Sequence, residues 1–284
     1  MTMTRNMPDK GLPMELALKE YQVREAVREA ADSQERGKVL VGFSGGVDSS
    51  LLLWESVQAI GSGRVIAVTA TSPTSVLEGE EQARQFAADL KVRHLIVPTE
   101  ECADPAFLSN SPKRCYVCKR IRYTRIANLS ESLGSQVVLD GTQADDDPTD
   151  RPGMAALEEL GIRSPLAQAG VTKQEVRVLL KAAGFPELAD QQAEPCLATR
   201  IPYGETITEE ALETVRRGEQ ILKTCGLEFV RLRHHGTWAR IVTDRAGMTA
   251  MLHDHNARRK ISAELKELGF QYVTMDLEEY GTRR

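Results

Sequence analysis

The chain has 284 residues, of which 41% are hydrophobic and 27% are charged, and its formal net charge is −5. This composition allows one large or two modest packed domains, while the negative charge disfavours binding of nucleic acid through a basic face. No apolar segment approaches the ~20 residues that a membrane-spanning helix needs. The five cysteines do not indicate a disulfide scaffold, and residues 1–14 lack a secretory signal. We therefore expect a cytoplasmic protein that binds neither nucleic acid nor a membrane.

Strands and helices alternate in the first half of the chain. The predicted strands are residues 39–43, 64–69, 94–97 and 136–140, and the predicted helices are residues 49–60, 76–90 and 118–133. This order indicates an α/β fold with a parallel, doubly wound sheet. Ligands of such sheets bind outside the carboxyl ends of the strands. One pocket should therefore be lined by residues 44–49, by Ala70 and Thr71, and by Gly141 and Thr142.

A smaller α+β domain is predicted at the C-terminal end. Thr172 with Glu175 three residues later has the capping-box pattern and predicts a helix that ends near Gly184. Residues 191–204 lack periodicity and contain two prolines, which indicates a linker or functional loop. We expect domains at residues 1–200 and 201–284. The elements predicted for the second domain are a helix at 208–225, a hairpin at 229–233 and 239–243, a helix at 247–268 and a strand at 272–275.

The segment Ser44-Gly45-Gly46-Val47-Asp48-Ser49 carries the strongest chemical signal. It lies between a predicted strand and a predicted helix. Glycines let an anion approach the main chain, and a helix N-terminus favours negative charge. The lysine of the common P-loop is absent and an aspartate is present. Asp48 beside phosphate is reasonable if a divalent cation lies between them, so we expect binding of ATP with Mg²⁺.

A Cys-x-x-Cys pair, Cys115 and Cys118, lies near the start of a predicted helix. These thiols could be redox-active, because a helix N-terminus and nearby cations activate thiols. They could also bind a metal, although no second pair of ligands follows at a spacing typical of a zinc site. Alternatively the segment only shapes the wall of the pocket, with Arg114 and Lys119 directed toward phosphate. The sequence leaves these alternatives open.

Three further features are candidates for chemistry. Cys196 lies on a loop bounded by prolines with Arg200 close by, which is typical of an accessible thiolate but also of a buried cysteine. Arg231 and Arg233 alternate with apolar residues, so a strand would place both guanidinium groups on one face as an anion clamp. Acidic residues follow the strand that ends near Asp140, and they are candidate contacts for magnesium or ribose.

Five segments in this order resemble the LarE family of ATP-dependent sacrificial sulfur transferases, which belongs to the N-type ATP pyrophosphatases with a PP-loop. The similarity extends over residues 38–244 and is carried by Ser44-Gly45-Gly46-Val47-Asp48-Ser49, Arg114-Cys115-Tyr116-Val117-Cys118-Lys119, Asp140-Gly141-Thr142-Gln143-Ala144-Asp145-Asp146, Arg163-Ser164-Pro165-Leu166 and Pro195-Cys196-Leu197-Ala198-Thr199-Arg200-Ile201-Pro202-Tyr203-Gly204.

The resemblance implies an activity and an assignment of residues. In this family a carboxylate of pyridinium-3,5-biscarboxylic acid mononucleotide is adenylylated. A protein cysteine then gives up its sulfur and becomes dehydroalanine, in a step toward the nickel-pincer nucleotide cofactor of lactate racemase. The implied catalytic residue is Cys196. The expected ATP contacts are Ser44, Gly45, Gly46, Val47, Asp48, Ser49, Ala70, Thr71 and Gly141; the expected contacts of substrate phosphate are Thr199, Arg200, Arg231 and Arg233; and the expected metal ligands are Asp48 and Glu219.

The resemblance also implies a homo-oligomer that takes a small nucleotide substrate. Some relatives bind an iron–sulfur cluster through three cysteines, and Cys115 and Cys118 keep that mode open. The competing hypotheses are a tRNA thiolase, an ammonia-dependent ligase of the NAD or GMP synthetase type, and a nucleotide-sensing module without catalysis. A thiolase would need a surface or module for binding RNA, and a ligase would not need Cys196.

Overall fold

The computed structural model describes residues 11–33, 37–135, 137–147 and 151–280. The chain forms two compact units. The first unit contains Met1–Thr71, Val76–Thr99 and Cys115–Glu194, and the second contains Ser72–Ser75, Glu100–Arg114 and Pro195–Arg284. Two short internal segments thus belong to the same unit as the C-terminal part of the chain. The two units therefore cannot be separated at a single position in the sequence. The division into domains 1–200 and 201–284 stays a prediction.

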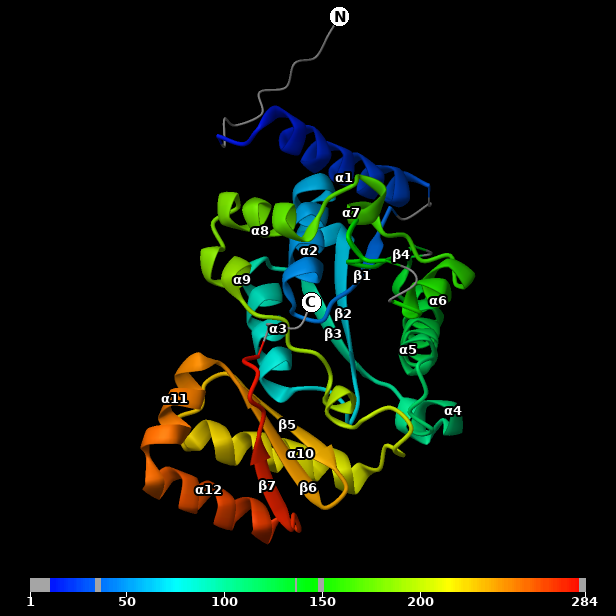
Figure 1. The fold of residues 1–284 in the computed structure, drawn as a ribbon. Helices are drawn as coiled ribbons and strands as arrows, with labels where there is room; N and C mark the ends of the chain where they lie inside the picture. The colour runs from blue at the N-terminus through cyan, green and yellow to red at the C-terminus, as the bar shows by residue number, and fades with distance from the viewer. Residues whose placement is uncertain (1–10, 34–36, 136, 148–150, 281–284) are drawn as a thin grey trace, which may run out of the picture. The chain divides into compact units, whose positions relative to one another are not determined.

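The first unit is built on a four-stranded parallel sheet, as predicted (Figure 1). Its strands lie in the order β3-β2-β1-β4. Their bounds are β1 Val39–Gly42, β2 Val65–Thr71, β3 Arg93–Pro98 and β4 Val138–Leu139. Residue 136, at the start of the predicted fourth strand, lies outside the described residues. Strands β2 and β3 lie on one side of β1, and the chain then returns to place β4 on the other side. The carboxyl ends of β1 and β4 therefore form the kind of crevice in which α/β proteins bind ligands.

Helices cover both faces of this sheet. Side chains of β1 alternate between two apolar clusters, because successive residues of a strand point to opposite faces. Val39 and Val41 belong to one cluster and Leu40 to the other. The first cluster includes residues from α1 Met14–Asp32, α2 Val47–Ile60, α3 Leu77–Asp89, α7 Pro165–Gln168, α8 Lys173–Ala182 and α9 Pro186–Asp190. The second includes residues from α5 Arg114–Ser130 and α6 Gly153–Glu159.

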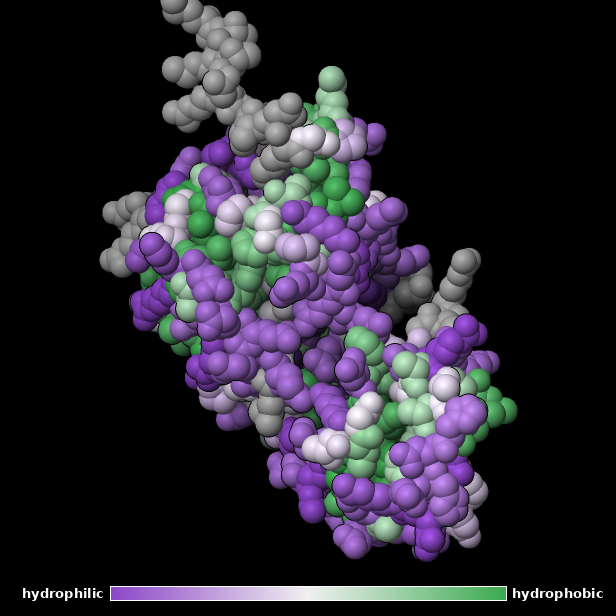
Figure 2. Space-filling view, turned by 90° about the vertical axis from the view of Figure 1, so that its left-hand side faces the viewer, coloured by the Kyte–Doolittle hydropathy of each residue, from purple (hydrophilic) through white to green (hydrophobic). Residues whose placement is uncertain are grey.

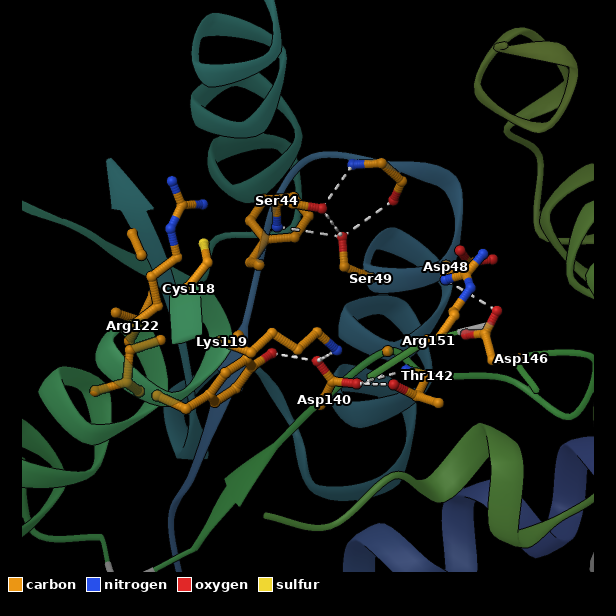
Figure 3. A pocket seen from close by; sticks show the side chains of 18 residues that line it. Ser44, Asp48, Ser49, Cys118, Lys119, Arg122, Asp140, Thr142, Asp146 and Arg151 are labelled. Atoms are coloured by element: carbon orange, nitrogen blue, oxygen red, sulfur yellow. Dashed lines mark hydrogen bonds and ion pairs between the residues drawn. The ribbon is translucent and has the colours of Figure 1, made fainter. Parts of the chain in front are cut away.

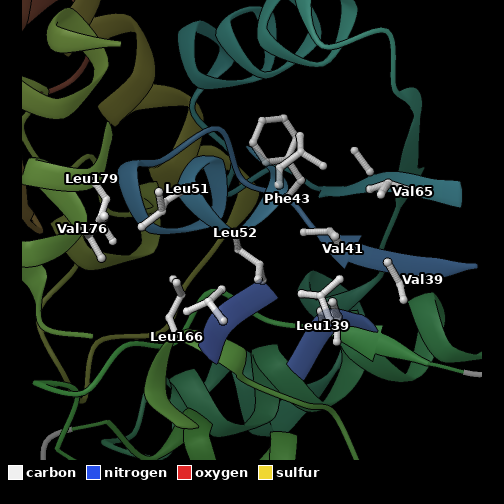
Figure 4. Packing of buried hydrophobic residues seen from close by; sticks show 14 of the residues in the cluster. Val39, Val41, Phe43, Leu51, Leu52, Val65, Leu139, Leu166, Val176 and Leu179 are labelled. Carbon is white, nitrogen blue, oxygen red and sulfur yellow. The ribbon is translucent and has the colours of Figure 1, made fainter. Parts of the chain in front are cut away.

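Close packing between β1, α2 and α8 fixes the base of the first unit. Figure 4 shows Val41 and Leu139 of the sheet next to Leu52 of α2, with Val176 and Leu179 of α8 farther along. All five of these side chains are at most 2% exposed. Burial of a leucine or valine side chain contributes roughly 1.5–3 kcal/mol. This core therefore anchors the segment between β1 and α2 at both of its ends.

The second unit contains a three-stranded sheet in the order β5-β6-β7. Strands β5 Val230–His235 and β6 Trp238–Thr243 form the predicted antiparallel hairpin, and β7 Tyr272–Met275 is parallel to β6. Its apolar cluster joins the sheet to the helices that follow and precede it. The helices of that cluster are α10 Glu209–Thr224, α11 Arg245–His253 and α12 His255–Glu267, and the unit also contains α4 Pro105–Leu108. Short 3-10 helices in the two units are η1 Ser62–Arg64, η2 Glu101–Ala103, η3 Glu131–Leu133 and η4 Leu197–Arg200.

One expectation about helices was wrong, and one helix was not foreseen. The helix predicted at 247–268 is two helices, because Asp254 adopts extended backbone angles and its carboxylate caps α12 by accepting from the Ala257 N–H at 2.9 Å. The long helix α1 was not predicted. It packs through Val23 and Val27 into the cluster that also contains α2.

Among the described residues, no helix is both long and apolar enough to span a bilayer. Figure 2 shows one face of the molecule, on which hydrophilic side chains predominate and hydrophobic ones are gathered in separate patches.

Candidate active site

The segment between β1 and α2 is a hydroxyl-rich loop at the carboxyl end of β1. The Ser49 hydroxyl donates to the Gly46 carbonyl at 3.1 Å, and it lies 3.1 Å from the Ser44 hydroxyl. The Ser44 N–H donates to Ser49 Oγ at 3.3 Å. Gly46 is the N-cap residue of α2 in an extended conformation. Main-chain N–H groups and two hydroxyls therefore gather at the N-terminus of a helix, where an anion is favoured.

Glycine is required at two positions around this loop. Gly45 has φ +78°, which side chains rarely adopt, and a Cβ there would lie 2.8 Å from the Gly79 carbonyl oxygen. A Cβ on Gly141, the second residue after β4, would lie 2.9 Å from the Ser49 nitrogen. The carboxyl end of β4 thus approaches the first turn of α2 more closely than any side chain would allow.

Asp48, in the first turn of α2, is held by a lysine from a distant helix. The Lys173 ammonium donates to both Asp48 carboxylate oxygens, at 2.7 and 2.8 Å. Lys173 is the first residue of α8, and its own N–H donates to an Asp145 carboxylate oxygen at 2.7 Å. A cation is electrostatically unfavourable at a helix N-terminus. The carboxylates of Asp48 and Asp145 offset this unfavourable energy for Lys173.

Asp140 is the hub of a buried polar network on the other side of the pocket. One carboxylate oxygen accepts from the Thr142 N–H at 2.8 Å and from the Thr142 hydroxyl, and the other accepts from the Tyr123 hydroxyl and, at 3.4 Å, from Lys119. Burial acts to raise the pKa of Asp140, but the Lys119 charge and the hydrogen bonds from Thr142 and Tyr123 lower it overall. Burial, followed by the Asp140 charge, raises the pKa of Tyr123 well above its ordinary value. Asp140 is therefore a carboxylate and Tyr123 a neutral donor at neutral pH.

Ser44, Ser49, Asp48 and the network around Asp140 line one pocket in the first unit (Figure 3). Of the predicted ATP contacts, the pocket brings together Ser44, Gly46, Asp48, Ser49, Ala70 and Gly141. Three others are not among its lining residues. Gly45 shapes the turn, Val47 is buried in the core, and the Thr71 hydroxyl donates to Glu80. Whether any of them contacts ATP stays a prediction.

Thr142, predicted to line this pocket, is among its lining residues. Cys118, Lys119, Asp140 and Asp146, from two segments that the sequence offered as candidates, line it too. Three other polar lining residues, Arg122 and Tyr123 of α5 and Arg151, were not predicted. The Arg151 guanidinium lies 2.9 Å from Asp146. Lys173 was also missed, although the sequence predicts the capping box at Thr172 and Glu175. A lysine as first residue of a helix was the available signal, because the helix dipole disfavours it there.

The predicted nucleophile, Cys196, belongs to the second unit and is half-buried. It is the N-cap residue of η4, and its carbonyl accepts from the Thr199 hydroxyl at 2.8 Å and from Arg200 at 3.2 Å. Arg200 is only 2% exposed. The same guanidinium also donates to the carbonyl of Pro195. Thr199 and Arg200 therefore brace the loop of Cys196, and a contact of either with substrate phosphate stays a prediction.

Glu219 of α10 connects this loop to strand β5. Its oxygens accept from the Arg200 guanidinium at 2.9 and 3.2 Å, and one also accepts from the Leu232 N–H at 3.0 Å. Arg231 and Arg233 flank buried Leu232 on the strand, and the Arg231 guanidinium lies 5.2 Å from the centre of the Tyr280 ring. A metal at Glu219 stays a prediction, and it would compete with Arg200 for the same carboxylate oxygens.

No cluster of three or more candidate metal-ligating side chains occurs in the described part of the chain. Asp48 provides a carboxylate in the first turn after the anion-binding loop, and Asp140 and Asp146 line the same pocket. This donor set fits Mg²⁺, which proteins usually hold through one or two carboxylates together with phosphate oxygens of the substrate.

Comparisons with known proteins agree with this geometry. The NAD synthase family model matches residues 20–138. An uncharacterized protein of Synechocystis sp. is 37% identical over 87% of this chain and 91% of its own length. The pyridinium-3,5-bisthiocarboxylic acid mononucleotide synthase of Lactiplantibacillus plantarum is 32% identical over 84% of this chain and 86% of its own length. A component of the glutamine-hydrolyzing GMP synthase of Methanoculleus marisnigri is 27% identical over 80% of this chain and 84% of its own length.

The match to the mononucleotide synthase extends well beyond the region shared with NAD synthase, since it covers 84% of the chain. Together with the parallel sheet and the glycine loop between β1 and α2, this match shows that the chain belongs to the LarE family of pyridinium-3,5-bisthiocarboxylic acid mononucleotide synthases.

Proposed function

We propose that this protein is an ATP-dependent sulfurtransferase that converts a carboxylate of pyridinium-3,5-biscarboxylic acid mononucleotide into a thiocarboxylate, with Cys196 as the sulfur donor. The observation that carries the proposal is the likeness to the mononucleotide synthase over most of the chain. The loop of Ser44 and Ser49 supports the use of ATP, because it presents N–H groups and hydroxyls to an anion at the start of α2.

The first step activates the substrate. A carboxylate oxygen attacks the α-phosphate of ATP, the bond to the β-phosphate breaks, and pyrophosphate leaves. The hydroxyls of Ser44 and Ser49 and the N–H groups of the loop bind the pyrophosphate part. Bound at Asp48, Mg²⁺ would offset the negative charge of that leaving group. The product is an acyl-adenylate, in which AMP is a good leaving group.

The second step transfers sulfur. The Cys196 thiolate attacks the acyl carbon and displaces AMP, giving a thioester with the protein. Removal of the Cα proton of Cys196 then breaks its Cβ–S bond. The sulfur leaves as a thiocarboxylate, and dehydroalanine remains in the chain. Each polypeptide therefore donates one sulfur. Arg231 and Arg233 are proposed to bind the substrate phosphate, because two guanidinium groups on one strand face suit an anion.

Intact-mass measurement tests this proposal. The full-length protein is incubated with ATP, Mg²⁺ and the dicarboxylate mononucleotide, and we expect its mass to fall by the elements of H₂S, with the loss located at Cys196. Cys196→Ala should release pyrophosphate but form no thiocarboxylate. An unchanged protein mass alongside thiolated product would contradict the sacrificial step and favour a cluster-dependent or persulfide-dependent mode.

The same assay separates the competing enzyme classes. An ammonia-dependent ligase would form an amide from ATP and ammonia, and Cys196→Ala would retain that activity. A tRNA thiolase would require tRNA as the sulfur acceptor. We also propose that the protein is a homo-oligomer in the cytoplasm, which size-exclusion chromatography with light scattering would test for the oligomeric state.

A further inference from the structure

The N-terminal part of α5 carries two thiols that the proposed sulfur transfer does not use. Cys115 is exposed, whereas Cys118 is half-buried and lines the nucleotide pocket with Arg122 (Figure 3). All five cysteines of the chain are thiols rather than disulfides. One thiol of the pair is thus accessible to reagents in solution, and the other lies at the wall of the pocket.

The spacing of these cysteines allows a disulfide. In an α-helix, residues three apart have Cα atoms about 5 Å apart, which lies within the range of disulfide-bonded cysteines. Their Cβ atoms, at about 5–6 Å, would have to approach to about 4 Å. The first four N–H groups of a helix have no partners within it, so the Cys115 end of the pair can shift toward Cys118. Cys115 is the second residue of α5.

The charge around the pair favours an anionic oxidant. Residues 113–122 contain five basic residues and no acidic residue, and two of their side chains contact carboxylates of other elements, Lys119 that of Asp140 and Tyr116 that of Glu159. The segment therefore keeps an excess of positive charge. The positive end of the helix adds to this field. Oxidised glutathione carries several carboxylates, so it is attracted to this segment more strongly than a neutral disulfide would be.

Movement of this turn would reach the pocket through Lys119. Lys119 follows Cys118 directly, and its ammonium lies 3.4 Å from the Asp140 carboxylate. A Cβ on Gly153, the first residue of α6, would lie 2.9 Å from Lys119 Cδ and 3.2 Å from the Cys115 carbonyl oxygen. The turn is therefore packed tightly against α6, and it cannot contract without shifting the pocket wall that Cys118 and Lys119 form.

We propose that Cys115 and Cys118 are a redox modification site, at which a reversible disulfide lowers the affinity of the pocket for nucleotide. Exposed Cys115 attacks one sulfur of oxidised glutathione as a thiolate and releases one glutathione. Cys118 then attacks the Cys115 sulfur of the mixed disulfide and releases the second glutathione. Two electrons and two protons pass from the protein to the oxidant. The effect on affinity rests on the proposed binding of ATP in this pocket.

Peptide mass tests the disulfide itself. Trypsin cleaves after Arg114 and Lys119, so both cysteines fall in one pentapeptide, residues 115–119. After treatment of the full-length protein with oxidised glutathione, we expect this peptide to lack two hydrogen atoms, and dithiothreitol should restore them. A stable glutathione adduct on Cys115, or a cross-link from Cys118 to Cys196, would overturn the proposal.

Nucleotide binding tests the consequence. We expect the oxidised protein to bind ATP about tenfold more weakly than the reduced protein, a difference of about 1.4 kcal/mol. Cys115→Ser should bind ATP like the reduced wild type before and after oxidation, whereas Cys225→Ser should respond like the wild type. Equal affinity of the two forms, with the pentapeptide fully oxidised, would refute the effect on the pocket. Failure of both forms to bind ATP would instead contradict the proposed function, and the peptide mass would still decide whether the disulfide forms.

Discussion

Lys173 and Asp48 are 125 positions apart in the chain, yet the Lys173 ammonium contacts both oxygens of the Asp48 carboxylate. Both groups are partly exposed, with side-chain exposures of 35% and 27%. The pair therefore lies at the edge of the anion-binding loop, where an incoming triphosphate and its cation would meet it. In this arrangement the positive charge of Lys173 balances the negative charge of Asp48 beside the loop.

Replacement of Lys173 tests the role of this pair. In Lys173→Met the Asp48 carboxylate loses its counter-charge and repels the triphosphate. We expect ATP to bind at least about tenfold more weakly, as measured by calorimetry without Mg²⁺, because the cation would otherwise replace the lysine charge at Asp48. Lys173→Arg keeps the positive charge and should retain most of the affinity. Equal affinity of wild type and Lys173→Met would show that the ion pair has no part in nucleotide binding.

Gly141 is expected to tolerate no side chain. In Gly141→Ala the new methyl group would lie 2.9 Å from the Ser49 nitrogen and 3.0 Å from its Cα, and both are main-chain atoms that cannot move alone. We expect lower stability by about 1–3 kcal/mol and weaker ATP binding, measured by urea denaturation and calorimetry. Gly63→Ala is the matched control, because nothing lies within 4 Å of a Cβ there. If both variants behave alike, the close approach of β4 to α2 is wrong.

His94 makes the stability of the first unit sensitive to acid. Burial, followed by the charge of Arg84, lowers the pKa of His94 below its ordinary value of 6.5. Its ring Nε2 lies 2.8 Å from the Thr69 hydroxyl, and the ring packs against Phe43. Above the ordinary pKa, His94 is neutral in both states. As the pH falls below it, the unfolded chain binds the proton first and the folded state loses stability.

The measurement is urea denaturation between about pH 7.5 and pH 5. We expect the free energy of unfolding of the wild type to fall more steeply over this window than that of His94→Gln, which has no imidazole at this position to titrate. Parallel curves for the two proteins would remove His94 as the cause of acid sensitivity.

The anion-binding loop could be predicted from sequence because its determinants are local. A buried apolar strand, two glycines and a helix start follow one another within residues 39–50, and the structure has β1 and α2 in these places. The parallel sheet followed from the same alternation of apolar segments. The contact of Lys173 with Asp48 could not be predicted in this way, since it depends on how α8 packs against α2.

Competition between local signals explains the wrong helix at 247–268. The segment after Gly247 contains no glycine or proline that would break a helix, but the carboxylate of Asp254 caps the next helix instead of continuing the first. Asp, Asn, Ser and Thr favour helix caps because their side chains bond to free N–H groups.

Arg200 illustrates a different limit of prediction from sequence. An arginine beside a candidate nucleophile resembles a ligand contact, and only the fold places it at 2% exposure against Glu219.

The pair of Arg200 and Glu219 is expected to hold the Cys196 loop in place. Glu219→Gln would leave a buried guanidinium without its carboxylate, which costs about 3–5 kcal/mol when a buried ion pair is broken. We expect this loss of stability in urea denaturation without any added metal. We also expect the sulfur of Cys196 to be lost more slowly than in the wild type, as measured from the intact mass of the protein over time.

Glu213→Gln is the matched control, because Glu213 pairs with Arg216 on the same helix while its side chain is 53% exposed. Loss of an exposed pair should cost less than about 1 kcal/mol. The alternative role of Glu219, as a metal ligand, makes a different prediction. If Glu219→Gln were as stable as the wild type without metal, and differed from it only in the Mg²⁺ concentration needed for pyrophosphate release, Glu219 would act through the metal. A metal-independent loss of stability would instead mean that Glu219 acts through Arg200, because that guanidinium joins it to the carbonyls of Pro195 and Cys196.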